Sequence, residues 1–353
     1  MEEVYKDLAR RLDELPNGFP ATASGVELKL LDKLFTPEEA ELTCHLWLTP
    51  ESSKSIAVRL ERDEREIRSL LKTMVRKGLI AYEKREKSVG FRILPFVVGF
   101  YERQNADIDE EFAQLFEQYY QEVFHNTMNT KPSMHRVIPV ETAIPLNIEV
   151  MPHQRASEYL ESANAWGVLN CICRVQARLI GKGCDHSVNN CLVFSKRTGA
   201  FDAVDGIRAL SKQEALDILE SAQQEGLVAT TGNFQRGVNY ICNCCTCSCG
   251  FLRAVVERSN LDTVARSDFY SVIDESLCTA CGECAPRCVF NAIVEGDEYY
   301  QIVRERCVGC GLCVEVCSIN ALRLQQKSSD EKEEPPVDEE EWQQRRVESR
   351  KDL

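Results

Sequence analysis

The sequence lacks the features of several common protein classes. No apolar run approaches the length of a membrane-spanning helix, and the first eleven residues are charged and amphipathic, unlike the apolar core of a signal segment. Neither a GxGxxG nor a GxxxxGKS/T motif occurs, which argues against nucleotide, flavin or ATP chemistry in this chain. The net charge of −14 argues against a general nucleic-acid surface. We therefore expect a cytoplasmic protein without a membrane span.

Cysteine, by contrast, is abundant, with 18 residues among 353. In a small secreted chain this would indicate disulfides. In a chain of this size without a signal segment, cysteines at CxxC spacing indicate metal ligands. Eight of them form two copies of one pattern, C-x2-C-x2-C-x3-C, near the C-terminus. The first copy contains Cys278, Cys281, Cys284 and Cys288, and the second contains Cys307, Cys310, Cys313 and Cys317.

This pattern is typical of chains that bind four-iron clusters, because thiolates two residues apart reach neighbouring corners of a cluster when the chain turns tightly. On this pattern, and on the repeated Asn-Ala-Ile and Asn-Ala-Leu that follow it, residues 267–325 resemble the dicluster bacterial-type ferredoxins. A hairpin is expected over 289–306. Val289 and Ser318 stand where that family usually has proline, which bears on the fine geometry and the potential.

The resemblance implies two [4Fe-4S] clusters, with the fourth cysteine of each run ligating the other cluster. One cluster then has the ligands Cys278, Cys281, Cys284 and Cys317. The other has Cys307, Cys310, Cys313 and Cys288.

Nine further cysteines lie in the middle of the chain, at spacings that do not match the ferredoxin pattern. They form Cys171-x-Cys173-x10-Cys184-x6-Cys191 and Cys242-x-Cys244-Cys245-x-Cys247-x-Cys249. Three interpretations stay open: one or two additional iron–sulfur clusters, structural zinc, or a dithiol switch. The simplest arrangement gives one cluster to the first four cysteines and another to four of the last five. The two groups could also share ligands.

The front of the chain resembles a winged helix-turn-helix over residues 35–95. Helices are expected over 37–49, from Ser52 or Ser53 to Leu60, and from Asp63 to Gly78, followed by strands over 79–83 and 90–94. A charged stretch, 84–87, joins the two strands. The third helix carries nearly equal numbers of acids and bases, so it offers few phosphate contacts. We therefore favour docking of a protein partner over DNA binding.

These patterns predict an α+β multidomain fold. It has an N-terminal winged helix-turn-helix, a mixed α/β cysteine-rich middle domain and a C-terminal ferredoxin-like dicluster domain. The expected divisions are a helical lead (1–34), the winged-helix-like module (35–103), the middle domain (104–265), the dicluster domain (266–326) and a disordered charged tail (327–353). Within the middle domain we expect helices over 107–124 and 211–226, and strands at 227–230 and 240–241.

The leading functional hypothesis is a single-electron carrier or an electron-transfer subunit that serves a partner redox enzyme in an anaerobe. Two other classes stay open. One is a redox-sensing winged-helix regulator that binds DNA. The other is a catalytic iron–sulfur enzyme with an incompletely ligated iron in the middle domain, which the odd fifth cysteine of 242–249 would permit.

Overall fold

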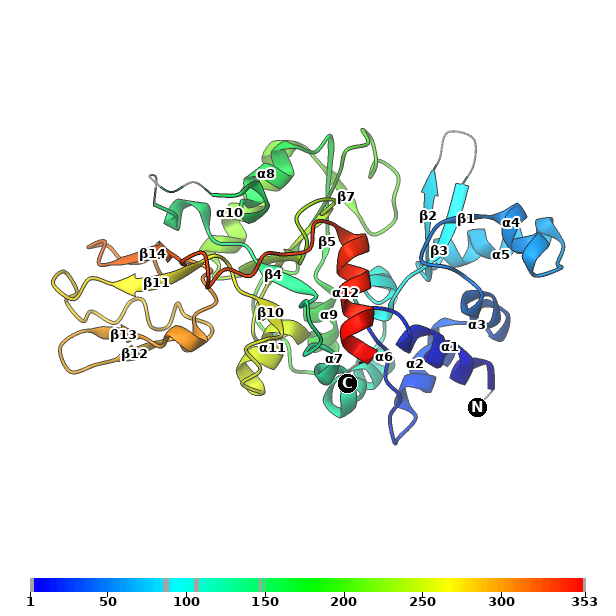
Figure 1. Ribbon diagram of the computed structural model, residues 1–353, viewed down its shortest axis with the longest axis horizontal. Helices are drawn as coiled ribbons and strands as arrows, with labels where there is room; N and C mark the ends of the chain where they lie inside the picture. Colours follow the sequence, from blue (N-terminus) through cyan, green and yellow to red (C-terminus); the bar gives the residue numbers. More distant parts are fainter. Residues whose placement is uncertain (1–2, 85–88, 105–107, 146–147, 149, 352–353) are drawn as a thin grey trace. The chain divides into compact units, whose positions relative to one another are not determined.

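The computed structural model describes residues 3–84, 89–104, 108–145, 148 and 150–351 (Figure 1). The chain divides into two compact units, residues 1–127 with 350–353, and residues 128–349. The first unit therefore extends to residue 127, beyond residue 103, where we expect the winged-helix-like module to end. The aromatic helix assigned to the middle domain, α6 (Glu110–Tyr119), belongs to the first unit. Its aromatic face is buried there, and Phe116 stacks on Tyr101 with ring centroids 4.1 Å apart. The predicted start, Asp107, lies outside the described residues.

The first unit begins with two helices, α1 (Glu3–Asp13) and α2 (Val26–Leu34). The next six elements are α3 (Pro37–Cys44), β1 (Glu51–Ser52), α4 (Ser53–Arg59), α5 (Glu64–Arg76), β2 (Ile80–Lys84) and β3 (Val89–Ile93). The strands form an antiparallel sheet in the order β1-β3-β2. Of the predicted connection 84–87, only Lys84 lies in the described part of the chain. The predicted helices and the two predicted strands are present, whereas β1 was not anticipated.

Helix α3 starts as predicted but ends earlier. Thr36 and Glu39 form a capping box, which satisfies backbone N–H groups that the first turn leaves unpaired. The helix was expected to reach Thr49, but it ends at Cys44. The reason is tertiary, because the carbonyl of Trp47 accepts a hydrogen bond from the N–H of Ile93 at 3.0 Å. Residues after Cys44 thus pair with the sheet instead of extending the helix.

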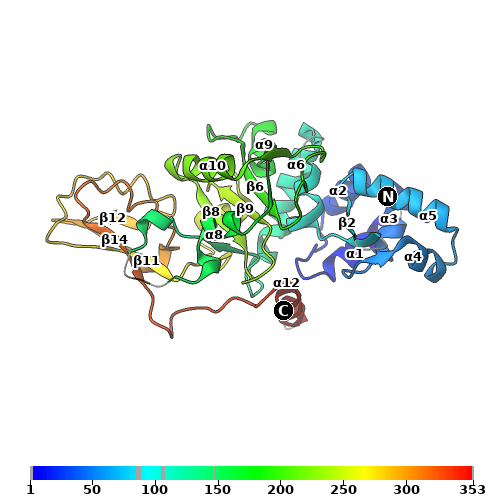
Figure 2. The same cartoon turned by 90° about the horizontal axis from the view of Figure 1, so that it is seen from above.

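The second unit is organised around a seven-stranded sheet in the order β10-β4-β8-β9-β6-β5-β7. Only the β10–β4 pair is parallel. Helices α8 (Ala156–Glu161) and α10 (Lys212–Gln224) pack against each other (Figure 2). Leu160 of α8 and Leu219 of α10 form a hydrophobic core with residues of the strands. The strands are β4 (His135–Val137), β5 (Ala165–Asn170), β6 (Asn189–Ser195), β7 (Arg208–Leu210), β8 (Val228–Gly232), β9 (Tyr240–Cys244) and β10 (Val264–Ala265). The predicted helix over 211–226 is α10, and its Ser211–Glu214 capping box is present.

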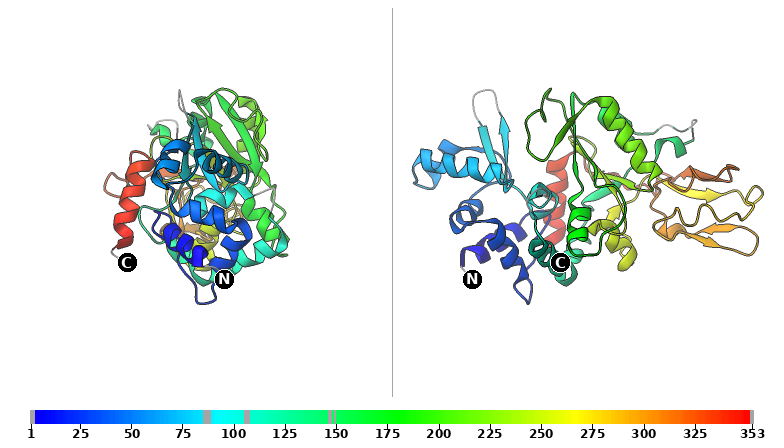
Figure 3. Two further views of the ribbon diagram at one scale, coloured as in Figure 1. Left: turned by 90° about the vertical axis from the view of Figure 1, so that its right-hand side faces the viewer. Right: turned by 180° about the vertical axis from the view of Figure 1, so that it is seen from behind.

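The dicluster segment of the second unit contains two small two-stranded sheets (Figure 3). Strand β11 (Phe269–Ile273) pairs with β14 (Leu322–Gln326), and β12 (Ile293–Glu295) pairs with β13 (Tyr300–Ile302). The second pair is the predicted hairpin over 289–306. The first pair was not predicted, because its strands lie on opposite sides of both cysteine runs and about fifty residues apart in sequence.

The tail is not disordered as predicted, because it contains α12 (Glu339–Lys351). Trp342 and Arg346, one helical turn apart, are both buried. The indole Nε1 donates a hydrogen bond to the carbonyl of Ser133 at 3.0 Å, and the guanidinium of Arg346 donates to the carbonyl of Pro132 at 2.7 Å. The charged composition of the tail does not predict this helix, because its buried residues are just Trp342 and Arg346. Among the described residues, no helix is both long enough and apolar enough to cross a bilayer.

Candidate metal centres

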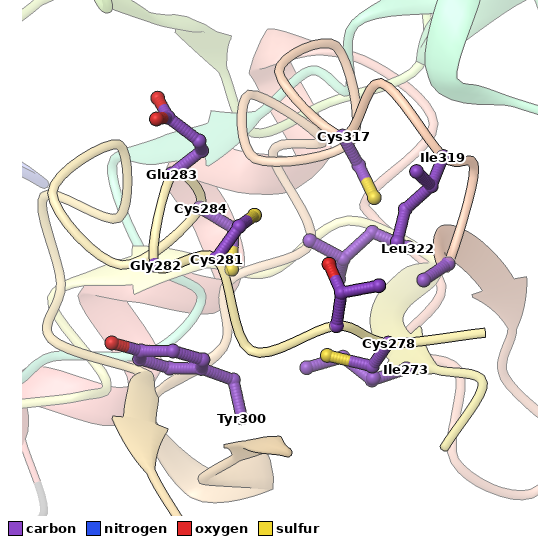
Figure 4. Close-up of a pocket in the computed structure, with 12 residues that line it drawn as sticks. Ile273, Cys278, Cys281, Gly282, Glu283, Cys284, Tyr300, Cys317, Ile319 and Leu322 are labelled. Carbon is purple, nitrogen blue, oxygen red and sulfur yellow. The ribbon is translucent and has the colours of Figure 1, made fainter. Parts of the chain in front are cut away.

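Four cysteines of the dicluster segment line one cavity, and we call them the first thiol set: Cys278, Cys281, Cys284 and Cys317. Their side chains face a common space beside Tyr300 (Figure 4). This space comprises about 340 Å³ not filled by atoms, part of it open to solvent. Three of these thiols come from the first run and one from the second. These four residues are also the ones that the ferredoxin resemblance assigns to one cluster.

Strand pairing explains why cysteines far apart in sequence meet. Because β11 pairs with β14 along five residues, the chain before the first run lies beside the chain after the second. The turn after each fourth cysteine is also the same in both runs. Asn291 donates its N–H to the carbonyl of Cys288 at 3.0 Å, and Asn320 donates to Cys317 at 3.0 Å. Both asparagines have a positive φ, 52° and 54°, which asparagine tolerates better than most residues.

The remaining cysteines of the two runs form a second thiol set: Cys288, Cys307, Cys310 and Cys313. The thiols of Cys310 and Cys313 interact electrostatically with those of Cys288 and Cys307. Burial raises the pKa of Cys313 to about 12. A buried thiol of this kind ionises when a positive charge compensates it, and a metal bound by thiolates provides that charge.

The sulfur atoms of the second thiol set accept hydrogen bonds from the chain. Ser271 in β11 donates its N–H to Sγ of Cys307 at 3.4 Å, and its hydroxyl lies 3.2 Å from Sγ of Cys313. The N–H of Ala292 points at Sγ of Cys288 at 3.2 Å. These donors stabilise charge on the sulfur atoms. No sequence pattern marks Ser271, because only the β11–β14 pairing brings it to the cysteines.

The two thiol sets share one hydrophobic cluster. Cys284 of the first set and Cys313 of the second both contribute to it, with Ile293 and Leu322 between the strands. The sets are thus close neighbours within a largely apolar interior. Residues 271–324 match the family model of the 4Fe-4S dicluster domain. No curated protein and no solved structure matches the chain significantly.

The match fits the chemistry of this segment. Eight thiols in two sets of four supply the ligands that two four-iron clusters need, and soft thiolate donors suit iron–sulfur clusters. The segment is therefore an iron–sulfur, metal-binding, ferredoxin-type domain. Together with the other cysteines, this indicates an iron–sulfur electron-transfer role.

The nine middle cysteines are grouped differently from the simplest prediction. Six of them form a closed ring in which each thiol interacts with two neighbours; in order around this thiol ring they are Cys171, Cys173, Cys249, Cys244, Cys242 and Cys191. The other three, Cys184, Cys245 and Cys247, form a separate three-thiol group. Cys184 therefore does not join Cys171, Cys173 and Cys191, and the five cysteines of 242–249 are divided between the two sites.

The thiol ring lies where strands end and helices begin. Cys171 precedes α9 (Ile172–Leu179) and Cys249 precedes α11 (Gly250–Glu257), each as the N-cap residue. Helix N-termini favour negative charge and so favour thiolates. Hydrogen bonds from the thiols of Cys173 and Cys191 hold the pKa of Cys171 well below its usual range. Cys244 also accepts hydrogen bonds from its neighbours, including the hydroxyl of Thr230 at 3.4 Å.

Strand parity explains the division of the 242–249 cysteines. Cys242 and Cys244 are two residues apart in β9, so both point to one face of the sheet. Cys245 directly follows the strand and is out of phase with them. It packs instead beside Cys184, Ala222 and Leu227. The CxCC spacing is consistent with this division, but the predicted strand covers only 240–241 and so does not include the cysteines.

A buried arginine lies between the two middle sites. Arg174 in α9 is fully buried, and its guanidinium donates to the Oδ1 of Asn190 and the carbonyl of Asn243, both at 2.7 Å. Its Nη1 lies 3.9 Å from Sγ of Cys245, and it interacts electrostatically with Cys171 in the ring. Among the described residues, no carboxylate forms an ion pair with it. A buried cation needs an anion nearby, so this arrangement favours ionised thiols, the form in which cysteine binds metals.

Proposed function

We propose that the protein is an iron–sulfur electron carrier, or an electron-transfer subunit, that relays single electrons to or from a partner redox enzyme. The cavity lined by the first thiol set carries this proposal, because it collects thiols from both runs within the segment that matches a dicluster family. Each thiol set would hold one [4Fe-4S] cluster, which supplies reversible one-electron chemistry when bound. The chain's own part is to supply the ligands, the hydrogen bonds from Ser271 and Ala292, and the apolar packing between the sets.

The thiol ring is our candidate for a further iron–sulfur cluster in the relay. It provides six thiols, two more than a four-iron cluster requires. The chain that follows strand β4 of the same sheet contacts the dicluster segment. Val140, three residues beyond β4, donates its N–H to the carbonyl of Cys310 at 2.8 Å. We propose that electrons pass within the chain between a cluster in the ring and the cluster of the second thiol set.

The partner is proposed to be a second polypeptide that carries the substrate chemistry, because this sequence holds no nucleotide-binding motif. The order α3, β1, α4, α5, β2, β3 is that of a winged helix, and we propose that this module docks the partner. No disulfide joins the cysteines of the described residues, so they remain available as metal ligands. A cytoplasmic location fits that state, since reducing compartments preserve thiols.

Metal analysis with spectroscopy of the intact chain tests the relay. After anaerobic purification we expect at least about eight irons with equal sulfide, and EPR signals of interacting reduced clusters after chemical reduction. About twelve irons would support a third cluster in the thiol ring. About eight would remove that cluster and leave the dicluster. Fewer than about four irons, or no signal on reduction, would overturn the proposed function.

A redox-sensing regulator is the second candidate, and the winged-helix order of elements is the observation that favours it. Helix α5 would then read the duplex. Its exposed face, however, mixes Glu64 and Glu66 with Arg65, Arg68 and Lys72. Binding to a random-sequence duplex library, selected at low salt in the oxidised and reduced states, decides between the two. Enrichment of one sequence in one state only would establish the regulator. No enrichment in either state would leave the docking module.

A further inference from the structure

The three-thiol group differs from the other cysteine sites in its geometry. The Sγ atoms of Cys184, Cys245 and Cys247 all lie within 4.8 Å of one another, and those of Cys184 and Cys245 are 3.9 Å apart. Its three cysteines differ in solvent exposure: Cys245 is buried, Cys184 is half-buried and Cys247 is exposed. It therefore reaches from the interior to the surface of the second unit.

This spacing suits a single metal ion. Two thiolates on one tetrahedral zinc, each about 2.3 Å from the metal, stand about 3.8 Å apart. In a four-iron cluster each thiolate binds a different iron, so the ligand sulfurs are further apart than two ligands of one ion. The 3.9 Å separation between Cys184 and Cys245 agrees with the first case.

The loop that carries Cys184 is fixed by contacts on both sides. The guanidinium of Arg178 donates to the carbonyl of Cys184 at 3.0 Å and to that of His186 at 2.7 Å. Glu225 accepts hydrogen bonds from the N–H and the hydroxyl of Ser187, at 2.5 and 2.6 Å. Such outer contacts orient ligands before a metal binds, which lowers the entropic cost of assembling the site.

The sulfur atoms also have partners that suit thiolates. The hydroxyl of Ser248 lies 3.6 Å from Sγ of Cys184, and the guanidinium of Arg174 lies 3.9 Å from Sγ of Cys245. Three thiolates and one divalent cation carry a net charge of −1. The fully buried Arg174 lies beside the buried Cys245 and compensates this charge locally.

We propose that Cys184, Cys245 and Cys247 bind one thiophilic divalent cation, zinc in the first instance, and leave its fourth position open. Thiolate donors select such metals over harder cations. Among the described residues, no fourth histidine, cysteine, aspartate or glutamate joins the group at this spacing. An exposed, three-ligand site is the arrangement of zinc centres that bind an exogenous ligand. Zinc has no redox chemistry, so this site stands apart from the electron relay.

Zinc and iron analysis of the intact, anaerobically purified chain tests the assignment. We expect about one zinc per chain in the wild type, and a loss of about tenfold in Cys247→Ser with iron content and EPR signals unchanged. Cys247 is exposed, so this variant disturbs the core least. Cys44→Ser, far from the group in sequence and in the other unit, is the matched control and should keep its zinc.

Cobalt substitution tests the geometry and the open position separately. Co²⁺ exchanged into the wild type should give thiolate charge-transfer bands and the visible bands of a tetrahedral site, both absent in Cys247→Ser. Added 2-mercaptoethanol should shift the visible bands if the fourth position is open. A fall in iron in Cys247→Ser, a wild type without zinc or cobalt binding, or bands that the thiol leaves unchanged would each overturn the proposal. None of these results bears on the dicluster counts.

Discussion

The guanidinium of Arg174 lies 3.9 Å from Sγ of Cys245 and donates to the backbone of Asn243, so that one buried cation links the two thiol sites of the middle region. It belongs to α9, the helix that starts at Cys171 of the thiol ring. The chain thus places a positive charge where anionic thiolates collect, and not on a solvated surface.

Arg174→Met should release metal from the middle region and destabilise the second unit. Removing one partner of a buried charge pair costs about 3–5 kcal/mol, because the other charge is left uncompensated. Arg174→Lys keeps the charge but not the planar fork that reaches Asn190 and Asn243, so we expect an intermediate loss. Metal content and anaerobic thermal unfolding measure both effects. Arg208→Met, which removes only an exposed pair with Glu214, should cost less than about 1 kcal/mol. If Arg174→Met and Arg208→Met lowered the metal content and the unfolding temperature equally, the proposed role of Arg174 would be wrong.

Paired substitutions test the crossed grouping of the dicluster cysteines. Cys278 and Cys317 line the same cavity, so Cys278→Ser with Cys317→Ser should remove one cluster, about four irons. Cys278→Ser with Cys288→Ser removes one ligand from each thiol set, so both clusters, about eight irons, should be lost. The measurement is iron per chain in anaerobically purified protein. If the first pair instead cost more iron than the second, the uncrossed grouping would hold.

Ser271→Ala should lower the reduction potential of the cluster held by the second thiol set. The hydroxyl near Cys313 stabilises charge on sulfur, and losing it favours the oxidised state. We expect a shift on the order of 20–60 mV, the one-electron equivalent of about 0.5–1.5 kcal/mol for one hydrogen bond. EPR-monitored redox titration measures it. Ser276→Ala, which loses contacts only to Asp274, should leave both potentials unchanged. A shift confined to the other cluster would refute the assignment.

His153 should make stability depend on pH near neutrality. Burial, reinforced by the positive charge of Arg136, lowers its pKa to about 4 from an ordinary value of 6.5. The unfolded chain therefore takes up a proton that the folded chain excludes, so the contribution is complete above about pH 6.5 and declines as the pH falls toward 4. Between pH 7.5 and 5.5 we expect a loss of about 1 kcal/mol that His153→Gln removes. Denaturant unfolding of the wild type and of His153→Gln at each pH measures it.

Local signals predicted much of the secondary structure. The capping box at Ser211 and the hairpin over 289–306 depend on residues close together in the chain, and both are present. Elements defined by distant partners were missed. Strand β1 forms by pairing with β3, where Glu51 lies opposite Phe91, and α12 is held by the hydrogen bonds of Trp342 and Arg346 to residues 130–133. Contacts between distant residues produce no periodic pattern in the local sequence, so the elements that depend on them cannot be predicted from it.

The cysteine spacing alone indicates the metal chemistry of the dicluster segment. Two repeats of one cysteine spacing specify eight soft ligands, because the tight turns that let a chain wrap a cluster are local. The division of the nine middle cysteines between two sites, by contrast, depends on contacts between distant segments. Cys245 leaves the face of Cys242 and Cys244 because it falls out of phase at the end of β9, and it meets Cys184 from a loop about sixty residues away in the chain. Six thiols therefore lie in one site and three in another, because side chains alternate along β9 and because Cys245 packs beside the distant Cys184.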